Sequence, residues 1–161
     1  MRSLRRRAWW YLVALSLLIG LFGLTDIVGG VSADPGITLG LTGRTLAELE
    51  AEGALAYRAY DFTTRTQGLA LLIIGILATA VLLIPYRRGQ AWAWRLMWSL
   101  PAWTAGVFLM YVAFGLAPGA PPPPPMISGP LLGVLAAAIL LADRGRFARE
   151  PIRSGLVPEA A

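Results

Sequence analysis

The chain has 161 residues, of which 57% are hydrophobic and 14% charged, and its formal net charge is +5. Such a composition excludes an ordinary water-soluble domain. The absence of cysteine and histidine excludes disulfide exchange, thiolate nucleophiles, the usual zinc sites, His-ligated haem and Ser-His or Cys-His catalysis. We therefore expect neither a cofactor nor a metal.

The apolar residues are gathered into four long runs, and runs of this length predict membrane-spanning helices. The expected fold is all-α: a bundle of four transmembrane helices, with a short external amphipathic helix between spans one and two. One integral membrane domain covers 1–161. Its expected parts are spans at about 9–28, 68–84, 96–115 and 126–142, external loops at 29–67 and 116–125, a cytosolic turn at 85–95 and a cytosolic tail at 143–161.

The charges predict the orientation of these spans. Three segments that we place in the cytosol hold eleven of the fourteen basic residues, all of which are arginine, and three of the nine acids, for a net +8. The remaining residues carry a net −3. The eleven are Arg2, Arg5, Arg6, Arg7, Arg87, Arg88, Arg95, Arg144, Arg146, Arg149 and Arg153.

This bias follows the positive-inside rule and places both termini in the cytosol. The use of arginine without lysine, with abundant Ala, Gly and Pro, is typical of a bacterium with a GC-rich genome. The expected location is therefore a bacterial inner membrane, with the lipid bilayer as the first partner. The basic charge is explained without nucleic acid.

Five tryptophans fall at the predicted cytosolic ends of the spans, where indole rings settle at the headgroup level. We interpret them as an interfacial belt, made of Trp9, Trp10, Trp92, Trp94 and Trp98.

Span one has a rival interpretation as a secretory signal, because Val31-Ser32-Ala33 before Asp34 resembles a signal-peptidase site. The apolar run is long for a signal and contains Asp26, which favours a retained span. After it, Asp34-Pro35-Gly36 predicts a turn, and 37–43 a link rich in Gly and Thr.

The external helix is predicted from Thr45 and Glu48, whose spacing fits a capping box. Apolar residues then recur at spacings of three and four, with a break or bend near Gly53, and indicate a helix on the outer surface. Its acidic face is typical of a solvated face; docking of a partner or cation is the alternative.

Small residues mark the faces where helices can approach closely. Gly68 and Gly75 lie one heptad apart in span two, and Gly129, Gly133 and Ala137 form a stripe along span four. The stripe is expected to meet a neighbour in the same chain, with self-association as the alternative.

Prolines punctuate the second half of the chain. Pro85 is expected to end span two, and Pro101 to start or kink span three. The five prolines at 121–125 predict a stiff polyproline II strut in the external loop, either a spacer or a ligand for an aromatic groove.

The turn Tyr86-Arg87-Arg88-Gly89, followed after two residues by Trp92-Ala93-Trp94, resembles a turn in small uncharacterised bacterial four-span proteins, loosely similar to the DoxX-like group. Thr42-Gly43 before the acidic helix, and the Arg-x-x-Gly from Arg65 to Gly68, extend the resemblance over about residues 8–115. It implies the four-span topology and no particular reaction.

Asp26, Asp61 and Arg65 are the charged residues expected near the outer membrane surface. An acidic residue inside a span indicates a functional site and is expected to have a charged partner. For Asp26 the expected counter-ion is Arg65, which lies at similar depth and is shared with Asp61. The expected role is a salt bridge joining spans one and two. A polar site for the headgroup of a ligand, or a proton-coupled role, is the alternative.

The leading functional hypothesis is a non-enzymatic accessory or scaffold subunit that acts by helix association with another membrane protein or itself. The alternative is binding or transport of a small lipophilic molecule through the bundle, with Asp26 and Arg65 at its outer mouth. An enzyme would have to work without His or Cys, which leaves a thin set of groups for acid/base chemistry.

Overall fold

The computed structural model describes residues 8–147, and these form helices and turns without a strand. Four helical stretches are long and apolar enough to cross a membrane: Trp9–Ala33, Ala54–Tyr86, Ala91–Phe114 and Pro124–Phe147. The all-α prediction with four spans is therefore confirmed. The arginines at 2, 5, 6, 7, 149 and 153 lie outside the described residues, as does the predicted tail beyond Phe147.

The first two spans are built from α2 (Trp9–Gly29) with the 3₁₀ turn η1 (Gly30–Ala33), and α5 (Ala54–Val81) with the π-helical turn η2 (Leu82–Tyr86). Between them lie the short helices α3 (Pro35–Thr42) and α4 (Leu46–Glu52). The last two spans are α6 (Ala91–Met97) with α7 (Ser99–Phe114), and α8 (Pro124–Phe147).

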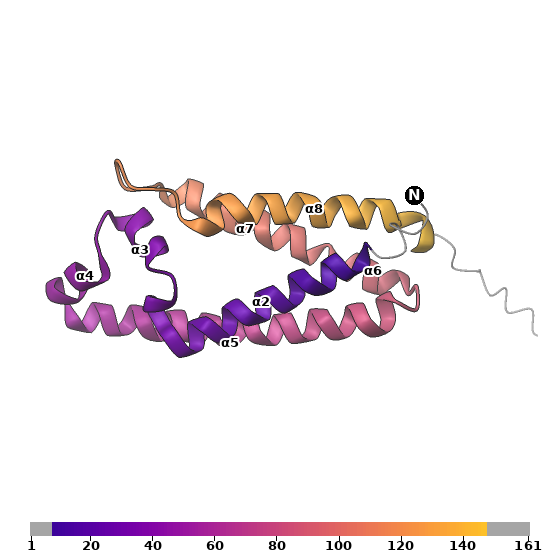
Figure 1. The fold of residues 1–161 in the computed structure, drawn as a ribbon, viewed down its shortest axis with the longest axis horizontal. Coiled ribbons are helices and arrows are strands. Elements are labelled where there is room, and N and C mark those ends of the chain that lie inside the picture. The colour runs from indigo at the N-terminus through magenta and orange to yellow at the C-terminus, as the bar shows by residue number, and fades with distance from the viewer. Residues whose placement is uncertain (1–7, 148–161) are drawn as a thin grey trace, which may run out of the picture.

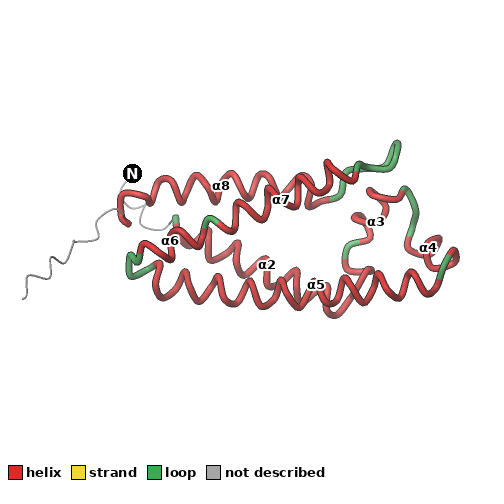
Figure 2. The backbone as a smooth tube through the Cα atoms, turned by 180° about the vertical axis from the view of Figure 1, so that it is seen from behind, coloured by secondary structure: helices red, strands yellow, loops and turns green. Residues whose placement is uncertain are grey.

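The helices are arranged as two pairs. α2 packs along α5, and α7 packs along α8, while the pairs touch each other mainly around α6 and η2 (Figures 1 and 2). From there the two pairs diverge toward α3 and α4. We name the two ends the arginine end, with the 86–90 turn, α6 and the last turn of α8, and the loop end, with α3, α4 and the 115–123 loop.

Glycines allow the close approach of α2 and α5. A Cβ on Gly75 would lie 2.6 Å from Gly20 Cα, and a Cβ on Gly68 would lie 2.6 Å from Asp26 Cβ. Both distances are shorter than atoms tolerate without movement of a helix backbone. The structure thus places Gly68 and Gly75 against α2.

The small-residue stripe on span four faces α7 of the same chain at Gly133. A Cβ on Gly133 would overlap the Thr104 hydroxyl of α7, whereas a Cβ on Gly129 would reach only the Thr104 carbonyl oxygen, at 4.0 Å. Ala137 is half-buried beside the buried seam. That seam consists of Gly133, Ala136, Leu140, Asp143 and Phe147.

Spans two and four are longer than expected. α5 begins at Ala54, directly after the break at Gly53, so residues 54–67, which the sequence placed in the external loop, belong to the second span's helix. α8 continues to Phe147 because Asp143, which the sequence placed in the tail, is buried and hydrogen-bonded. Carboxylates are accepted in such positions only when they have a partner.

The proline strut is shorter than expected. Pro124 and Pro125 lie in the first turn of α8, where proline is favoured because the missing N–H would have no helical partner. Pro101 lies in the first turn of α7, as the sequence predicted, whereas Pro85 lies inside η2.

The expected link at 37–43 is the helix α3. Pro35 starts it, the Asp34 carboxylate accepts a hydrogen bond of 3.1 Å from the Gly36 N–H, and Gly43 ends it with a φ of 70°. Asp as N-cap, proline at the first position and left-handed glycine at the C-cap are all helix-boundary signals.

The largest buried side chains gather in two places. Tyr86, Leu12, Leu82, Met97 and Leu140 join the two helix pairs toward the arginine end, while Thr38 and Pro123 are buried at the loop end. The two helix pairs are therefore fixed to each other near both ends.

Candidate binding pocket at the loop end

α3 connects the two helix pairs at the loop end. The Ala117 N–H donates a hydrogen bond of 3.0 Å to the Gly40 carbonyl oxygen. A Cβ on Gly40 would lie 2.6 Å from Pro123 Cγ, so only glycine allows α3 this close to the proline loop. On its other side, the Thr38 hydroxyl lies 3.3 Å from the Tyr60 hydroxyl of α5.

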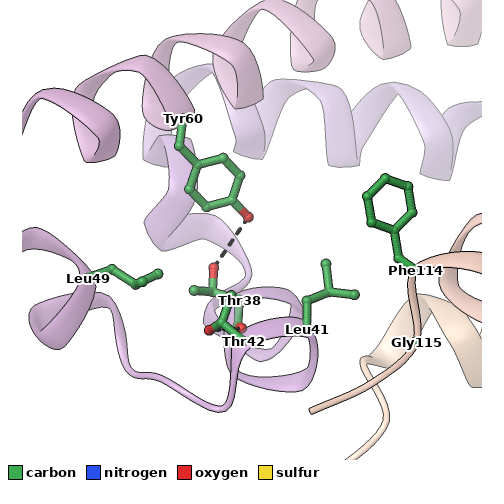
Figure 3. A pocket seen from close by; sticks show the side chains of 7 residues that line it. All are labelled: Thr38, Leu41, Thr42, Leu49, Tyr60, Phe114 and Gly115. Carbon is green, nitrogen blue, oxygen red and sulfur yellow. Dashed lines mark hydrogen bonds between the residues drawn. The ribbon is translucent and has the colours of Figure 1, made fainter. Parts of the chain in front are cut away.

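A pocket of about 410 Å³ opens between α3 and its neighbours. Figure 3 shows Tyr60 reaching toward Thr38, with Leu49 and Phe114 on opposite sides. The lining comes from α3, α4, α5 and the end of α7, and consists of Thr38, Leu41, Thr42, Leu49, Tyr60, Phe114 and Gly115.

The polar groups of this pocket are hydroxyls. Thr38 and Tyr60 share one hydrogen bond, and the Thr42 hydroxyl donates to the Thr38 carbonyl oxygen at 2.8 Å and accepts from the Arg44 N–H at 3.1 Å. No charged residue belongs to the lining. The arrangement suits binding of an uncharged apolar molecule, and it lacks a group that would serve as general acid or base near neutral pH.

α4, which carries Leu49 into the lining, is held by its N-terminal cap. The Glu48 N–H donates to the Thr45 hydroxyl at 3.3 Å, and the Thr45 N–H donates to the Glu48 carboxylate at 2.7 Å, which completes the predicted capping box. Hydrogen bonds from the Thr45 backbone and hydroxyl lower the pKa of Glu48. Arg44 and Glu52 form an exposed ion pair across the helix.

The charged constellation near this end is joined differently from the prediction. The Arg65 Nε donates to Asp61 at 2.8 Å, and within residues 8–147 Asp26 takes part in neither ion pair. The predicted Asp26–Arg65 salt bridge is therefore wrong, whereas Asp61 and Arg65 do form a pair. None of the three residues lines the pocket.

Arg65 instead caps the end of span one. Its guanidinium donates to the carbonyl oxygens of Ile27 at 2.6 Å and Val28 at 3.0 Å, while Asp61 accepts from the Val31 N–H at 3.0 Å. The last carbonyls of a helix lack partners inside the helix, so a guanidinium that reaches them replaces water. This arrangement joins spans one and two without Asp26.

Close packing reinforces this cap. Gly30 has a φ of 57°, and a Cβ on it would overlap the Asp61 carboxylate. The Asp61–Arg65 pair and Gly30 together fix the point where the chain leaves span one.

The tryptophans at the arginine end divide into two groups. Trp10 and Trp92 are about half exposed, at 53% and 52%, as a lipid-facing belt requires. Trp9 is buried, and the Trp94 Nε1–H donates to the Leu140 carbonyl oxygen at 2.8 Å. Trp98 is half-buried and meets the edge of Trp94, with ring centroids 6.0 Å apart.

Trp9, Trp94 and Trp98 therefore pack against the bundle at the arginine end, and Trp10 and Trp92 are the exposed members of the predicted belt. A buried indole keeps its N–H satisfied when a carbonyl acceptor is within reach, as Leu140 provides for Trp94.

One buried polar contact was not predicted from the sequence. The Tyr86 hydroxyl donates to the Asp143 carboxylate at 2.8 Å, and both side chains are buried. The signal was available: Tyr86 lies two residues after predicted span two and Asp143 directly after predicted span four, both on the predicted cytosolic side. An acidic residue next to an apolar run is expected to have a partner in the protein, at either end of the run.

The chain matches no protein-family model, no curated protein and no solved structure. The resemblance to the DoxX-like group stays a prediction.

Proposed function

We propose that this is a non-enzymatic membrane protein that binds a small, uncharged lipophilic molecule in the pocket at the loop end. The observation that carries the proposal is the lining of that pocket, in which hydroxyls of Thr38, Thr42 and Tyr60 stand among Leu41, Leu49 and Phe114. Such a surface suits a ligand with one hydrogen-bonding group, such as a hydroxyl or a carbonyl, on an apolar body.

We place this proposal before helix association because the small-residue faces of the spans pack against other helices of the same chain. Gly68 and Gly75 meet α2, and Gly133 meets α7. Arg65 caps the end of span one and Asp26 does not line the pocket, so the proposed polar ligand contact is the Tyr60 hydroxyl in place of Asp26 and Arg65.

The proposed location is a bacterial inner membrane, with the arginine end in the cytosol and the loop end outside. The support is the positive-inside rule, since five arginines of the described chain lie at the arginine end: Arg87, Arg88, Arg95, Arg144 and Arg146.

The test is native mass spectrometry of the full chain released gently from its own membrane, with identification of every small molecule retained. Leu41 is half-buried in the pocket lining, so Leu41→Trp fills the pocket. Leu109→Trp is its control, because Leu109 is 62% exposed on a spanning helix and does not line the pocket. A retained molecule that Leu41→Trp loses and Leu109→Trp keeps supports the pocket. Equal retention by both variants contradicts it.

Tyr60→Phe tests the polar contact in the same experiment. It removes the hydroxyl of a residue that is 37% exposed beside the pocket, and it keeps the aromatic ring. We expect retention to weaken about tenfold, the usual effect of a lost hydrogen bond of about 1.4 kcal/mol.

Helix association remains the second candidate, and one groove favours it. Along the α2–α5 pair a groove of about 420 Å³ is lined mainly by apolar side chains, among them Leu17, Leu21, Ile76 and Ala80. Ala80 is small and exposed, which permits close approach of another spanning helix. A stoichiometric second protein, lost when the exposed Ala80 is changed to Trp, would support this candidate over the pocket.

A further inference from the structure

Arginines from three segments gather at the arginine end. Arg87 and Arg88 follow η2, Arg95 lies on α6, and Arg144 and Arg146 lie in the last turns of α8. α6 packs against both η2 and α8, which brings the three segments together (Figure 1). All five side chains are exposed.

These guanidinium groups have no carboxylate partners in the described chain. The two ion pairs within residues 8–147 are Arg44–Glu52 and Asp61–Arg65, and neither involves this end. From residue 86 to 147 the chain has one acid, Asp143, which is 6% exposed and accepts the hydrogen bond from Tyr86. Within residues 8–147 no ion pair therefore neutralises the positive charge of this surface.

Arg146 is held in a defined position. Its guanidinium donates to the Arg87 carbonyl oxygen and lies 5.7 Å from the centroid of the Phe147 ring. A guanidinium has five N–H donors in a planar fork, so most of them stay available to an anion next to the Arg87–Arg88 turn.

The exposed indoles indicate the level of this surface relative to a membrane. Trp10 and Trp92 are about half exposed at the same end, and the Trp92 Nε1–H bonds the Gln90 side chain at 2.7 Å. Tryptophan prefers the headgroup level, which is where lipid phosphates lie.

We propose that the arginine end holds the phosphate of an anionic membrane lipid, with Arg87, Arg88 and Arg146 as its principal ligands. The apolar flanks of the neighbouring spans receive the acyl chains, which distinguishes a lipid from a free phosphate ion. This site is independent of the pocket at the loop end.

The test counts the phosphatidylglycerol molecules retained by the full-length protein in native mass spectrometry, after transfer into phosphatidylcholine nanodiscs with a small fraction of phosphatidylglycerol. The double variant Arg87→Gln/Arg146→Gln is compared with Arg44→Gln/Arg58→Gln, which removes the same charge at the loop end. We expect the first to weaken retention about tenfold and the second to leave it within about twofold.

A second pair, Arg88→Gln/Arg144→Gln, serves if the first variant does not fold, because neither side chain makes a hydrogen bond with any residue of 8–147. Equal retention by the arginine-end and loop-end variants would overturn the proposal. So would equal displacement of the lipid by inorganic phosphate at matched concentration, because it would show a site for free anions.

Discussion

Tyr86 and Asp143, 57 positions apart in the chain, form a buried hydrogen bond of 2.8 Å that joins the end of the second span to the end of the fourth. The Tyr86 ring also packs on Phe147, with centroids 4.8 Å apart. Within the described chain few contacts cross between the two helix pairs, and both side chains of this one are buried.

Removing the Tyr86 hydroxyl should therefore destabilise the bundle. Tyr86→Phe leaves the buried Asp143 carboxylate without its donor, and an unsatisfied buried group costs about 1–3 kcal/mol. We expect a lower midpoint of thermal unfolding in detergent. Tyr111→Phe is the control, since the Tyr111 hydroxyl makes no hydrogen bond within the part of the chain that the structure describes. Equal midpoints for the two variants would contradict the assignment.

The cap on span one makes a second prediction. Arg65→Gln removes the donors to Ile27 and Val28 and the ion pair with Asp61, and we expect a loss of about 1–2 kcal/mol in unfolding free energy because the site is partly solvated. Asp26→Asn should change it little, since Asp26 belongs to neither ion pair. Comparable losses in both variants would show that Asp26 has a role that the cap does not explain.

Substitution of two glycines with different surroundings should have opposite effects on stability. Gly75 lies where α5 packs on α2, and Gly106 lies on an open face of α7. Gly75→Ala places a Cβ 2.6 Å from Gly20 Cα and should cost about 1–3 kcal/mol by forcing the helices apart. Gly106→Ala meets no atom within 4 Å and should be neutral or stabilise α7 by up to about 1 kcal/mol. Chemical unfolding of both variants in mixed micelles measures the difference.

The capping box of α4 predicts a dependence on pH. The pKa of Glu48 is lowered by its bonds from Thr45, so the carboxylate stabilises α4 above the ordinary value of 4.5 and this stabilisation is lost as the pH falls through the lowered value. Protection factors for amide exchange in residues 46–52 should fall over that range in the natural chain. Glu48→Gln should abolish the change, and Glu50→Gln, which makes no bond to Thr45, should keep it.

The proposed orientation is tested with reporter fusions. Alkaline phosphatase needs disulfides that form outside the cytosol, so fusions after Ala33 and after Gly119 should be active and a fusion after Gly89 inactive. A fluorescent protein that matures only in the cytosol should give the reverse pattern. The opposite result for both reporters would place the arginine end outside.

Apolar run length was enough to predict the four spans, because each hydrocarbon crossing needs many consecutive apolar residues. The sequence also contained the boundary signals of α3, but Gly and Thr between them favoured a link. What the residues could not show was partner choice. Arg65 at the depth of Asp26 suggested a pair, yet the helix-end carbonyls of Ile27 and Val28 were nearer acceptors.

The unknown choice of partners is also the reason why the sequence did not predict the contacts of the tryptophans and of Asp143. An indole at a span end fits a lipid interface or a protein interior equally well, and only the fold supplies the Leu140 carbonyl that Trp94 uses. Asp143 follows an apolar run and resembles the first residue of a solvated tail until Tyr86 is placed beside it. The pocket at the loop end depends on four helices at once, so no local pattern indicates it.

The second span is one continuous helical stretch from Ala54 to Tyr86. Its 33 residues measure about 50 Å, against a hydrocarbon core of about 30 Å. Tyr60 on this rod touches the pocket, and Tyr86, one turn past its last regular residue, touches Asp143. Because both tyrosines belong to one continuous helical stretch, the helix rise sets the distance between the pocket at the loop end and the buried carboxylate at the arginine end.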